Sequence, residues 1–302
     1  MRFLRTCFVI VLAIVSCTHE PRGSRLSLSP RVDSIMNDTT PLHVLADSMR
    51  VMIRESESDT QALQYLIRMT EYMPAHVIRP FAEDVNRLTK ELNCTSCQPD
   101  ALCKMGIALF KKQLYDSAAI FFRRSLSLAQ QQKNGSMEAQ ALAWLGDYYR
   151  LTYRFDSCVY FSQKAADVAI QNKDYSRASH GLTFVGDIYR VQGITDTARM
   201  YYAQAMEYAI KANDPFRKSF ILTNVAETYR SQTKFDSASI FLDSAYHIAA
   251  PLRDYVRLGF ILTNMGDVSR MTGDQQKATI YYNDAIHAAK KGGDLRREAF
   301  AY

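Results

Sequence analysis

The chain has 302 residues, of which 47% are hydrophobic and 23% charged, and this is the composition of a folded protein rather than a disordered, collagen-like or low-complexity one. Its formal net charge of +6 is spread along the chain and is too small to indicate a nucleic-acid partner. Six cysteines in a chain of this length also exclude a disulfide-dense scaffold.

The N-terminus has the pattern of a secretory signal. Arg2 and Arg5 precede an apolar run over residues 7–15. This run is too short to span a bilayer as a helix. The next residues, Ile-Val-Ser-Cys at 14–17, resemble the lipobox of bacterial lipoproteins, in which the peptide is cut before a cysteine that carries lipid. The resemblance implies a signal peptide over residues 1–16 and lipidation of Cys17, which would anchor the chain stably in a membrane. An uncleaved anchor or an ordinary secretory signal stays open as the alternative.

Residues 17–41 predict a flexible tether, because proline, glycine, serine and arginine occur there without apolar periodicity. In the lipoprotein family, an aspartate after the lipidated cysteine retains the protein in the inner membrane, and here Thr18 occupies that place. We therefore expect a membrane-anchored lipoprotein of the outer membrane that faces the periplasm. No other apolar run approaches the roughly eighteen residues that a membrane span needs.

Residues 42–98 are predicted to form a helical N-terminal cap that contains a degenerate repeat. An amphipathic segment over residues 42–54 comes first, and helical apolar spacing begins again at Leu63. Pro80 is expected to open the next helix, because proline is well tolerated at a first helical position. This cap would cover the outer face of the repeats that follow.

A period of 40 residues governs the rest of the chain. Columns of leucine, of glycine or alanine, of alanine and of aromatic residues recur at this step. The leucine column is Leu102, Leu142, Leu182, Leu222 and Leu262, and the glycine column is Gly106, Gly146, Gly186, Ala226 and Gly266. Because self-similarity at a fixed step is typical of repeat architectures, five copies are predicted over residues 99–138, 139–178, 179–218, 219–258 and 259–298.

Each copy predicts two helices joined by a short turn. In the third copy Leu182, Val185 and Tyr189 lie on one stripe of a first helix. The second helices are expected to begin at an aspartate column whose side chains accept hydrogen bonds from main-chain N–H groups of the first turn: Asp116, Asp156, Asp196 and Asp236. In the fifth copy this cap is predicted to shift to Asp274. Another aspartate column precedes each new first helix: Asp174, Asp214, Asp254 and Asp294.

This pattern, L-x-x-[LVM]-[GA]-x-x-Y followed by two alanines on a second helix, resembles the tetratricopeptide repeat. It departs from that family in a 40-residue period instead of 34, which we attribute to a longer second helix or loop, and in Cys158, Leu109 and Ser269 at positions for alanine and tyrosine. The resemblance implies an all-α solenoid of helical hairpins, a right-handed superhelix whose first helices line a concave groove for peptides or partner proteins. The leucine column is expected to be buried, so that Leu222→Ala costs about 2–5 kcal/mol.

Charged and polar columns on the first helices form the candidate groove, with Trp144 and Phe184 beside them. Acidic residues lie three positions before arginines, which is close enough for an ion pair on a helix. These pairs either grip the backbone or termini of a peptide, or only order the stack, and both interpretations stay open here. The candidate groove residues are Asp147, Arg150, His180, Thr183, Asp187, Arg190, Phe220, Thr223, Glu227, Arg230, Phe260, Thr263, Asp267 and Arg270.

Cys94, Cys97 and Cys103 lie between the cap and the first repeat. A zinc site would need four ligands, and neither a histidine nor a second C-x-x-C is near. A thioredoxin-like centre would need a C-x-x-C at a helix start inside a βαβ unit. We therefore predict a structural disulfide among these cysteines, and we expect no metal site, no cofactor and no enzymatic activity.

Residues 294–302 repeat the start of the earlier copies and predict the beginning of an incomplete sixth repeat. This segment is either a short polar cap or a sign that the chain is part of a longer protein. The leading functional hypothesis is a non-catalytic lipoprotein that binds a protein or peptide in the periplasm. The alternative is the sensory array of a bacterial signalling or transcriptional regulatory protein, truncated before a transmembrane helix and an output domain.

Overall fold

The computed structural model describes residues 59–70, 75–91 and 97–292, together with residues 51, 55, 56 and 73. The predicted signal peptide and tether, Cys17, Cys94 and the predicted sixth-repeat segment therefore lie outside the described residues. The described part folds into α-helices joined by short turns and contains no β-strand. Among the described helices, none combines the length and the apolar character that crossing a bilayer requires.

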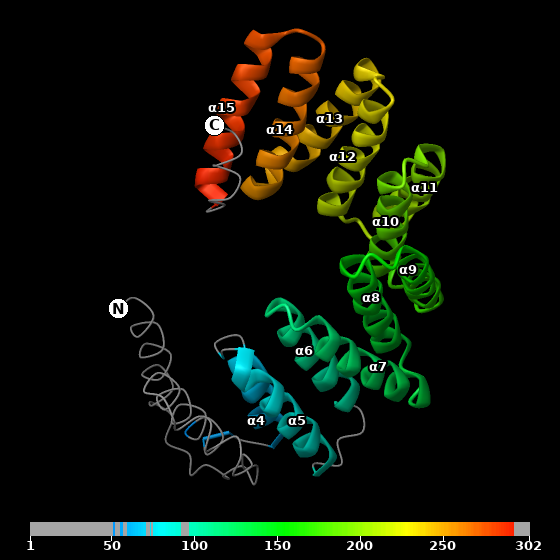
Figure 1. The fold of residues 1–302 in the computed structure, drawn as a ribbon, viewed down its shortest axis with the longest axis vertical. Helices are drawn as coiled ribbons and strands as arrows, with labels where there is room; N and C mark the ends of the chain where they lie inside the picture. Colours follow the sequence, from blue (N-terminus) through cyan, green and yellow to red (C-terminus); the bar gives the residue numbers. More distant parts are fainter. Residues whose placement is uncertain are drawn as a thin grey trace. The chain divides into compact units, whose positions relative to one another are not determined.

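The chain divides into two compact units between Met137 and Glu138. In the first unit, successive helices pack against each other in chain order (Figure 1). These helices are α4 (Asp59–Met69), α5 (Ala75–Glu91), α6 (Gln98–Lys111) and α7 (Tyr115–Gln131). The expectation that Pro80 opens a helix is wrong, since Pro80 lies inside α5. Val77 and Ile78 are fully buried and extend the apolar stripe ahead of Pro80, which favours helix there although proline forfeits one main-chain hydrogen bond.

The second unit is a row of helical hairpins, visible in Figure 1 as antiparallel helix pairs that follow one another in chain order. Its first helices are α8 (Gly135–Leu151), α10 (Tyr175–Val191), α12 (Pro215–Ser231) and α14 (Tyr255–Met271). Its second helices are α9 (Phe155–Gln171), α11 (Thr195–Lys211), α13 (Phe235–Ala249) and α15 (Gln275–Gly292). The hairpins begin one helical turn before the repeat boundaries at 139, 179, 219 and 259.

The 40-residue period arises from both arms of the hairpin. First and second helices such as α10 and α11 are each 17 residues long, and a turn such as residues 172–174 joins one helix to the next. In that turn Lys173 is left-handed, and the N–H of Asp174 donates to the carbonyl oxygen of Ala169 at 2.9 Å, which closes the preceding helix. The same bond recurs at every turn of the second unit except the one after α13.

The aspartates that precede the first helices cap them. Asp174, Asp214 and Asp254 accept hydrogen bonds from the main-chain N–H three residues on, at 3.0, 2.9 and 3.1 Å, and Asp274 does the same before α15. The prediction for the other aspartate column was wrong. The second helices begin one residue earlier, and the N-cap residues Leu114, Arg154, Ile194 and Lys234 make no side-chain cap. The aspartates are instead in the first turn, where the helix dipole still favours an acid.

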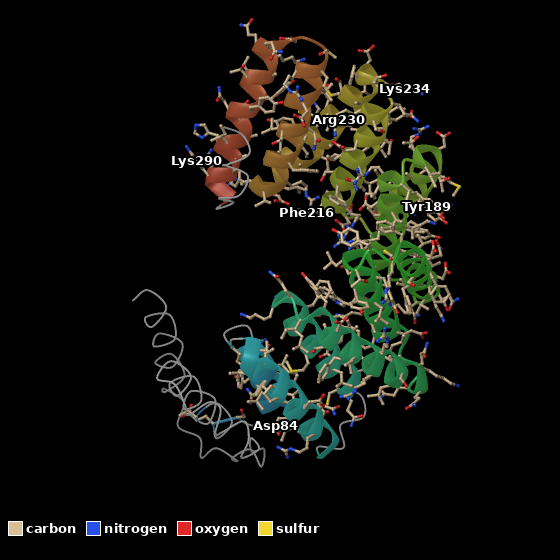
Figure 2. All side chains as sticks on the ribbon, viewed as in Figure 1. Asp84, Tyr189, Phe216, Arg230, Lys234 and Lys290 are labelled. Atoms are coloured by element: carbon tan, nitrogen blue, oxygen red, sulfur yellow. The ribbon has the colours of Figure 1, made fainter. Side chains whose placement is uncertain are left out.

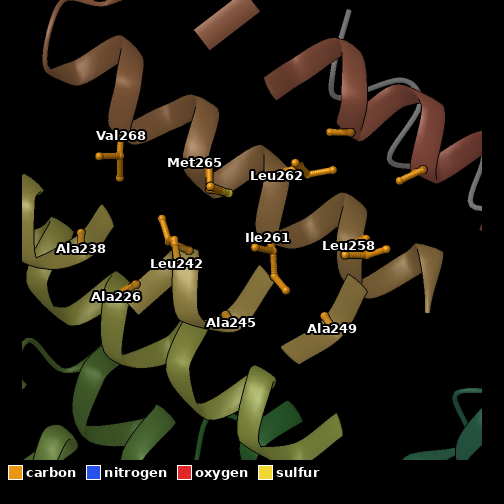
Figure 3. Packing of buried hydrophobic residues seen from close by; sticks show 12 residues of the cluster. Ala226, Ala238, Leu242, Ala245, Ala249, Leu258, Ile261, Leu262, Met265 and Val268 are labelled. Carbon is orange, nitrogen blue, oxygen red and sulfur yellow. The ribbon is translucent and has the colours of Figure 1, made fainter. Parts of the chain in front are cut away.

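Small residues let the two helices of a hairpin approach closely. A Cβ added at Gly186 would lie 2.6 Å from the ring of Tyr202, and one at Gly266 would lie 2.5 Å from the ring of Tyr282. The alanine columns are buried, and Figure 3 shows part of one such core, in which Ala238, Ala245 and Ala249 of α13 face α14. Glycine and alanine therefore set the spacing that large side chains of the partner helix fill.

The leucine column is buried in every copy but one. Leu102, Leu142, Leu182 and Leu262 are buried, whereas Leu222 is only partly buried and packs at the edge of the α12–α14 core. The neighbouring Ile221 takes the fully buried position in α12. The expected loss of about 2–5 kcal/mol for Leu222→Ala is therefore too large, since that range belongs to fully buried leucines.

Candidate functional site

The first helices of the second unit form one layer, since α10 packs against α12 and α12 against α14. We call α8, α10, α12 and α14 the first-helix layer. It carries all fourteen predicted groove residues, because they fall between residues 147 and 270 on these helices. What the layer can bind depends on which of their side chains the protein already uses for itself.

The predicted acid–arginine pairs form within their own helices. The guanidinium of Arg150 donates to Asp147 at 2.9 Å and that of Arg230 donates to Glu227 at 2.7 Å. Arg190 lies 4.0 Å from Asp187. Burial raises the pKa of Asp147, against the hydrogen bond and charge of Arg150, which lower it. Such pairs within one helix are expected if these residues only order the stack of helices.

Asp187 joins two neighbouring hairpins. One of its oxygens accepts a hydrogen bond from the hydroxyl of Tyr202 on α11 at 2.6 Å and another from the side-chain amide of Asn224 on α12 at 2.8 Å. Burial raises the pKa of this carboxyl, and the Tyr202 hydrogen bond and nearby arginines lower it again. Asp267 accepts from the hydroxyl of Tyr282 at 2.8 Å in the same way. Both aspartates are therefore satisfied by the protein and serve the packing of the hairpins.

Thr183 and Thr223 do not line a groove. Both side chains are buried, and their hydroxyls donate to the main-chain carbonyls of Ser179 and Ser219 one turn earlier. Thr263 makes the equivalent bond to Gly259 and is half-buried. Spacing within one helix cannot reveal that these side chains are covered.

Arginines and aromatic rings alternate along the first-helix layer. Arg150 of α8 lies over the ring of Phe184 of α10, with the guanidinium carbon 5.6 Å from the ring centre. Arg257 of α14 lies over Phe220 of α12 at 5.6 Å, and Arg217 lies over the same ring at 5.9 Å. We call these five residues the arginine–aromatic ladder. Each contact combines a cation with a half-buried ring, and two of them connect neighbouring hairpins.

His180 packs beside this ladder. Its ring meets that of Phe184 edge to face, with the ring centres 4.7 Å apart. Burial lowers the pKa of His180 to about 4, and Arg217 and Arg177 lower it as well. The imidazole is therefore neutral at neutral pH, and its position indicates a packing role.

A pocket of about 150 Å³ opens in the second unit, lined by Asp214, Phe216, Arg217, Phe220 and Arg257. These residues come from the N-terminal ends of α12 and α14, and Figure 2 shows Phe216 at that end of α12 with Lys234 beyond its other end. Phe216 is 44% exposed. Of the lining residues, only Phe220 belongs to the groove predicted from the sequence. The 40-residue step of the arginines that follow Asp174, Asp214 and Asp254 was the signal that could have found the rest.

The remaining predicted groove residues lie at the end of the layer. Phe260 is half-buried on α14, and Arg270 is exposed near the C-terminal end of the same helix. Trp144 is half-buried on α8.

In the first unit, a separate pocket of about 450 Å³ has basic residues in its wall, including Arg68, Lys104 and Lys111. Lys104 pairs with Asp100 at 2.6 Å.

The described cysteines are in structural positions. Cys97 is disulfide-bonded, with its partner sulfur outside the described residues, while Cys103 is a buried thiol in α6. Cys158 is a buried thiol as well, and burial raises its pKa to about 11, so that it is protonated and unreactive at neutral pH. Among the described residues, no three metal-ligating side chains of His, Cys, Asp or Glu lie together.

No protein-family model matches the chain, and no curated protein matches its sequence. Solved structures do share its fold. BtubC (BKLC) from P. vanneervenii is 19% identical with a TM-score of 0.61, covering 76% of this chain and 92% of that one. The Rap conjugation gene regulator of the plasmid pLS20, in complex with the Phr* peptide, is 16% identical with a TM-score of 0.60, covering 91% and 79%.

A third similar structure is aspartyl phosphate phosphatase F from Bacillus subtilis. It is 15% identical with a TM-score of 0.58, and the match covers 82% of this chain but only 64% of the length of that protein.

Together with the repeated hairpins, these similarities define the fold class. The chain is a tetratricopeptide-like, all-α helical-hairpin solenoid, as its sequence pattern predicted.

Proposed function

We propose that the chain is a non-catalytic scaffold whose first-helix layer binds a peptide, either free or as a segment of a partner protein. The arginine–aromatic ladder carries this proposal. Its rings offer apolar surface, and its guanidinium groups can hold carboxylates or peptide carbonyls. The peptide complex of the pLS20 Rap regulator, which has a similar fold, supports a peptide rather than a small molecule as the ligand.

The second part of the proposal concerns location. Cys17 carries lipid and anchors the scaffold in a membrane, with the repeats facing the periplasm. The lipobox resemblance of residues 14–17 supports this, because the apolar run before it has the length of a signal rather than of a membrane span. We expect membrane fractions to yield a chain whose first residue is acylated Cys17 by mass spectrometry. Recovery of Cys17→Ala in the membrane fraction at the wild-type level would contradict the lipid anchor.

Peptide binding can be tested with a random-sequence library of 12-residue peptides passed over the immobilised full chain. Phe184→Ala and Phe220→Ala should each reduce the retained peptide by about fivefold or more, since buried aromatic contacts dominate binding energy in such surfaces. Tyr160→Ala is the matched control, because Tyr160 is a 57% exposed aromatic residue on a second helix. Equal retention by all four proteins, or no retention at all, would contradict the proposal.

A second candidate function is the sensory part of a regulatory protein. The similarity to the Rap conjugation gene regulator, whose structure contains a bound peptide, favours this second candidate. In that case the first-helix layer would bind the signal, and an output domain would lie elsewhere in the polypeptide. The intact mass of the native protein decides between the two: a polypeptide that ends at Tyr302 supports the scaffold, and a longer one with a further domain supports the sensor.

A further inference from the structure

The three arginines that follow the first-helix caps are equivalent in sequence but differ in their contacts. Arg177 and Arg257 each turn back to the aspartate that caps their own helix, at 2.5 Å to Asp174 and 3.1 Å to Asp254. Arg217 occupies the same place in α12, and its main-chain N–H donates to Asp214 at 2.9 Å. Within the described residues, however, the guanidinium of Arg217 forms no such salt bridge.

Asp214 also contacts the neighbouring hairpin. Its second oxygen accepts a hydrogen bond from the hydroxyl of Ser176 on α10 at 3.2 Å. The Nε atom of Arg217 is buried and has no hydrogen-bond partner among the described residues. A buried donor without an acceptor costs free energy, so the protein does not fully satisfy this guanidinium.

The pocket beside Arg217 has the shape and chemistry of a small-anion site. Its volume of about 150 Å³ equals about five water molecules at roughly 30 Å³ each, which is enough for a carboxylate with the carbon atoms that bear it. Arg217 and Arg257 both line this pocket and both lie over the ring of Phe220. Asp214 lines the pocket as well, and the partly exposed Phe216 supplies an apolar wall.

We propose that this pocket is a carboxylate subsite, in which Arg217 and Arg257 hold one carboxylate of a bound peptide against Phe220. A planar carboxylate matches the fork of a guanidinium. That the carboxylate belongs to a peptide rests on the proposed function. The carboxylate comes from an acidic side chain or from the C-terminus of the peptide, and the test separates these sources.

The test follows the side-chain Nε–H signals of arginine by NMR in the full chain labelled with ¹⁵N-arginine. The signal of Arg217 is assigned by its loss in Arg217→Gln. Three probes are titrated: N-acetylglutamate methylamide has a side-chain carboxylate, N-acetylalanine has a terminal carboxylate, and N-acetylglutamine methylamide has neither. We expect the Arg217 and Arg257 signals to shift with one or both carboxylates and not with the neutral amide, and the stronger response identifies the source.

Variants show whether Arg217 itself binds the probe. In Arg217→Gln the response of the Arg257 signal should require about tenfold more probe, as expected for the loss of a charge-assisted hydrogen-bonded pair. Lys218→Gln removes the same charge from the adjacent residue, which does not line the pocket, and should respond like the wild type. Circular dichroism confirms that each variant is folded. Arg217→Lys keeps the charge but not the planar fork. The amount of probe that it needs should lie between those of the wild type and Arg217→Gln.

The outcomes separate this inference from the proposed function. Arg217 signals that do not move with either carboxylate, or that move equally with the neutral amide, overturn the subsite. If the peptide library is retained in that case, peptide binding stands without it. If the carboxylates shift Arg217 but no library peptide is retained, the subsite stands and the peptide scaffold fails.

Discussion

Tyr202 and Asp187 show how one residue pair can join three helices. The ring of Tyr202 lies against Gly186, where there is no side chain to exclude it, and its hydroxyl donates to the adjacent Asp187. Asp187 also accepts from Asn224 on the next hairpin. Burial is the largest cause of the raised pKa of Tyr202, so the phenol stays protonated and remains a donor. One oxygen of this carboxylate therefore serves the packing of the two hairpins.

Removing the hydroxyl should destabilise the protein. We expect Tyr202→Phe to lower the free energy of unfolding by about 1–3 kcal/mol, because a buried carboxylate loses one of its donors. Tyr282→Phe removes the same hydrogen bond to Asp267 in a more exposed setting and should cost less. Urea denaturation followed by circular dichroism measures both. Equal losses for the two variants would show that burial of Asp187 does not set the cost.

Within an element, the glycines at the centre of the first helices set how close the second helix lies. The need is strict at Gly186, where an added Cβ would overlap the ring of Tyr202. Gly259 of α14 has no such requirement for glycine, because the nearest atom to an added Cβ is 3.5 Å away, an ordinary contact distance. Two glycines inside helices of the same kind therefore predict opposite effects of the same substitution.

Gly186→Ala should destabilise the protein by about 1–3 kcal/mol, since the ring of Tyr202 is fully buried and cannot move away. Gly259→Ala should be neutral or stabilising by up to about 1 kcal/mol, because alanine favours a helix over glycine. Melting temperatures of the two variants and the wild type provide the comparison. A Gly186→Ala protein as stable as Gly259→Ala would mean that the hairpin can open at no cost.

At the scale of the second unit, the structure is a repeated arrangement in which each hairpin packs on the next. α11 packs against α12, and α13 packs against α14, so each second helix contacts the following first helix. The stability of such an arrangement is close to a sum over hairpins and their interfaces. Because one period holds two helices and two turns, Asp214 and Asp254 occupy equivalent places before a first helix.

Deletion of residues 215–254 should therefore leave a folded protein. It joins Asp214 to Tyr255, so an aspartate still caps a first helix of 17 residues. We expect unchanged helicity per residue by circular dichroism and a single unfolding transition with a smaller urea dependence, since less surface is exposed on unfolding. Deletion of residues 235–254, which removes only α13, places two first helices in succession and should abolish the cooperative transition. Loss of folding in the first deletion would contradict the repeat model.

The sequence by itself determined the repeat, its two-helix content and the caps of the first helices. These features depend on spacing along the chain: alanine, glycine and aspartate recur at 40 residues, and the caps of Asp174, Asp214 and Asp254 bond main-chain groups three residues away. The predicted caps of the second helices lie two residues after the observed ones, as Asp116 does relative to Leu114 in α7. Local spacing fixes which helix forms and identifies its end only to within about two residues.

Only the tertiary structure decided which side chains are available to a ligand. Thr183 and Thr223 belong to the groove predicted from the sequence, yet both side chains are buried. The Nε of Arg217 is buried without a partner among the described residues, and the neighbouring Asp214 accepts a hydrogen bond from Ser176, 38 residues away. A pattern within one helix cannot specify such contacts, because they arise from the packing of one hairpin on the next. The chain therefore encodes its repeat locally, whereas its candidate binding pocket exists only where two hairpins meet.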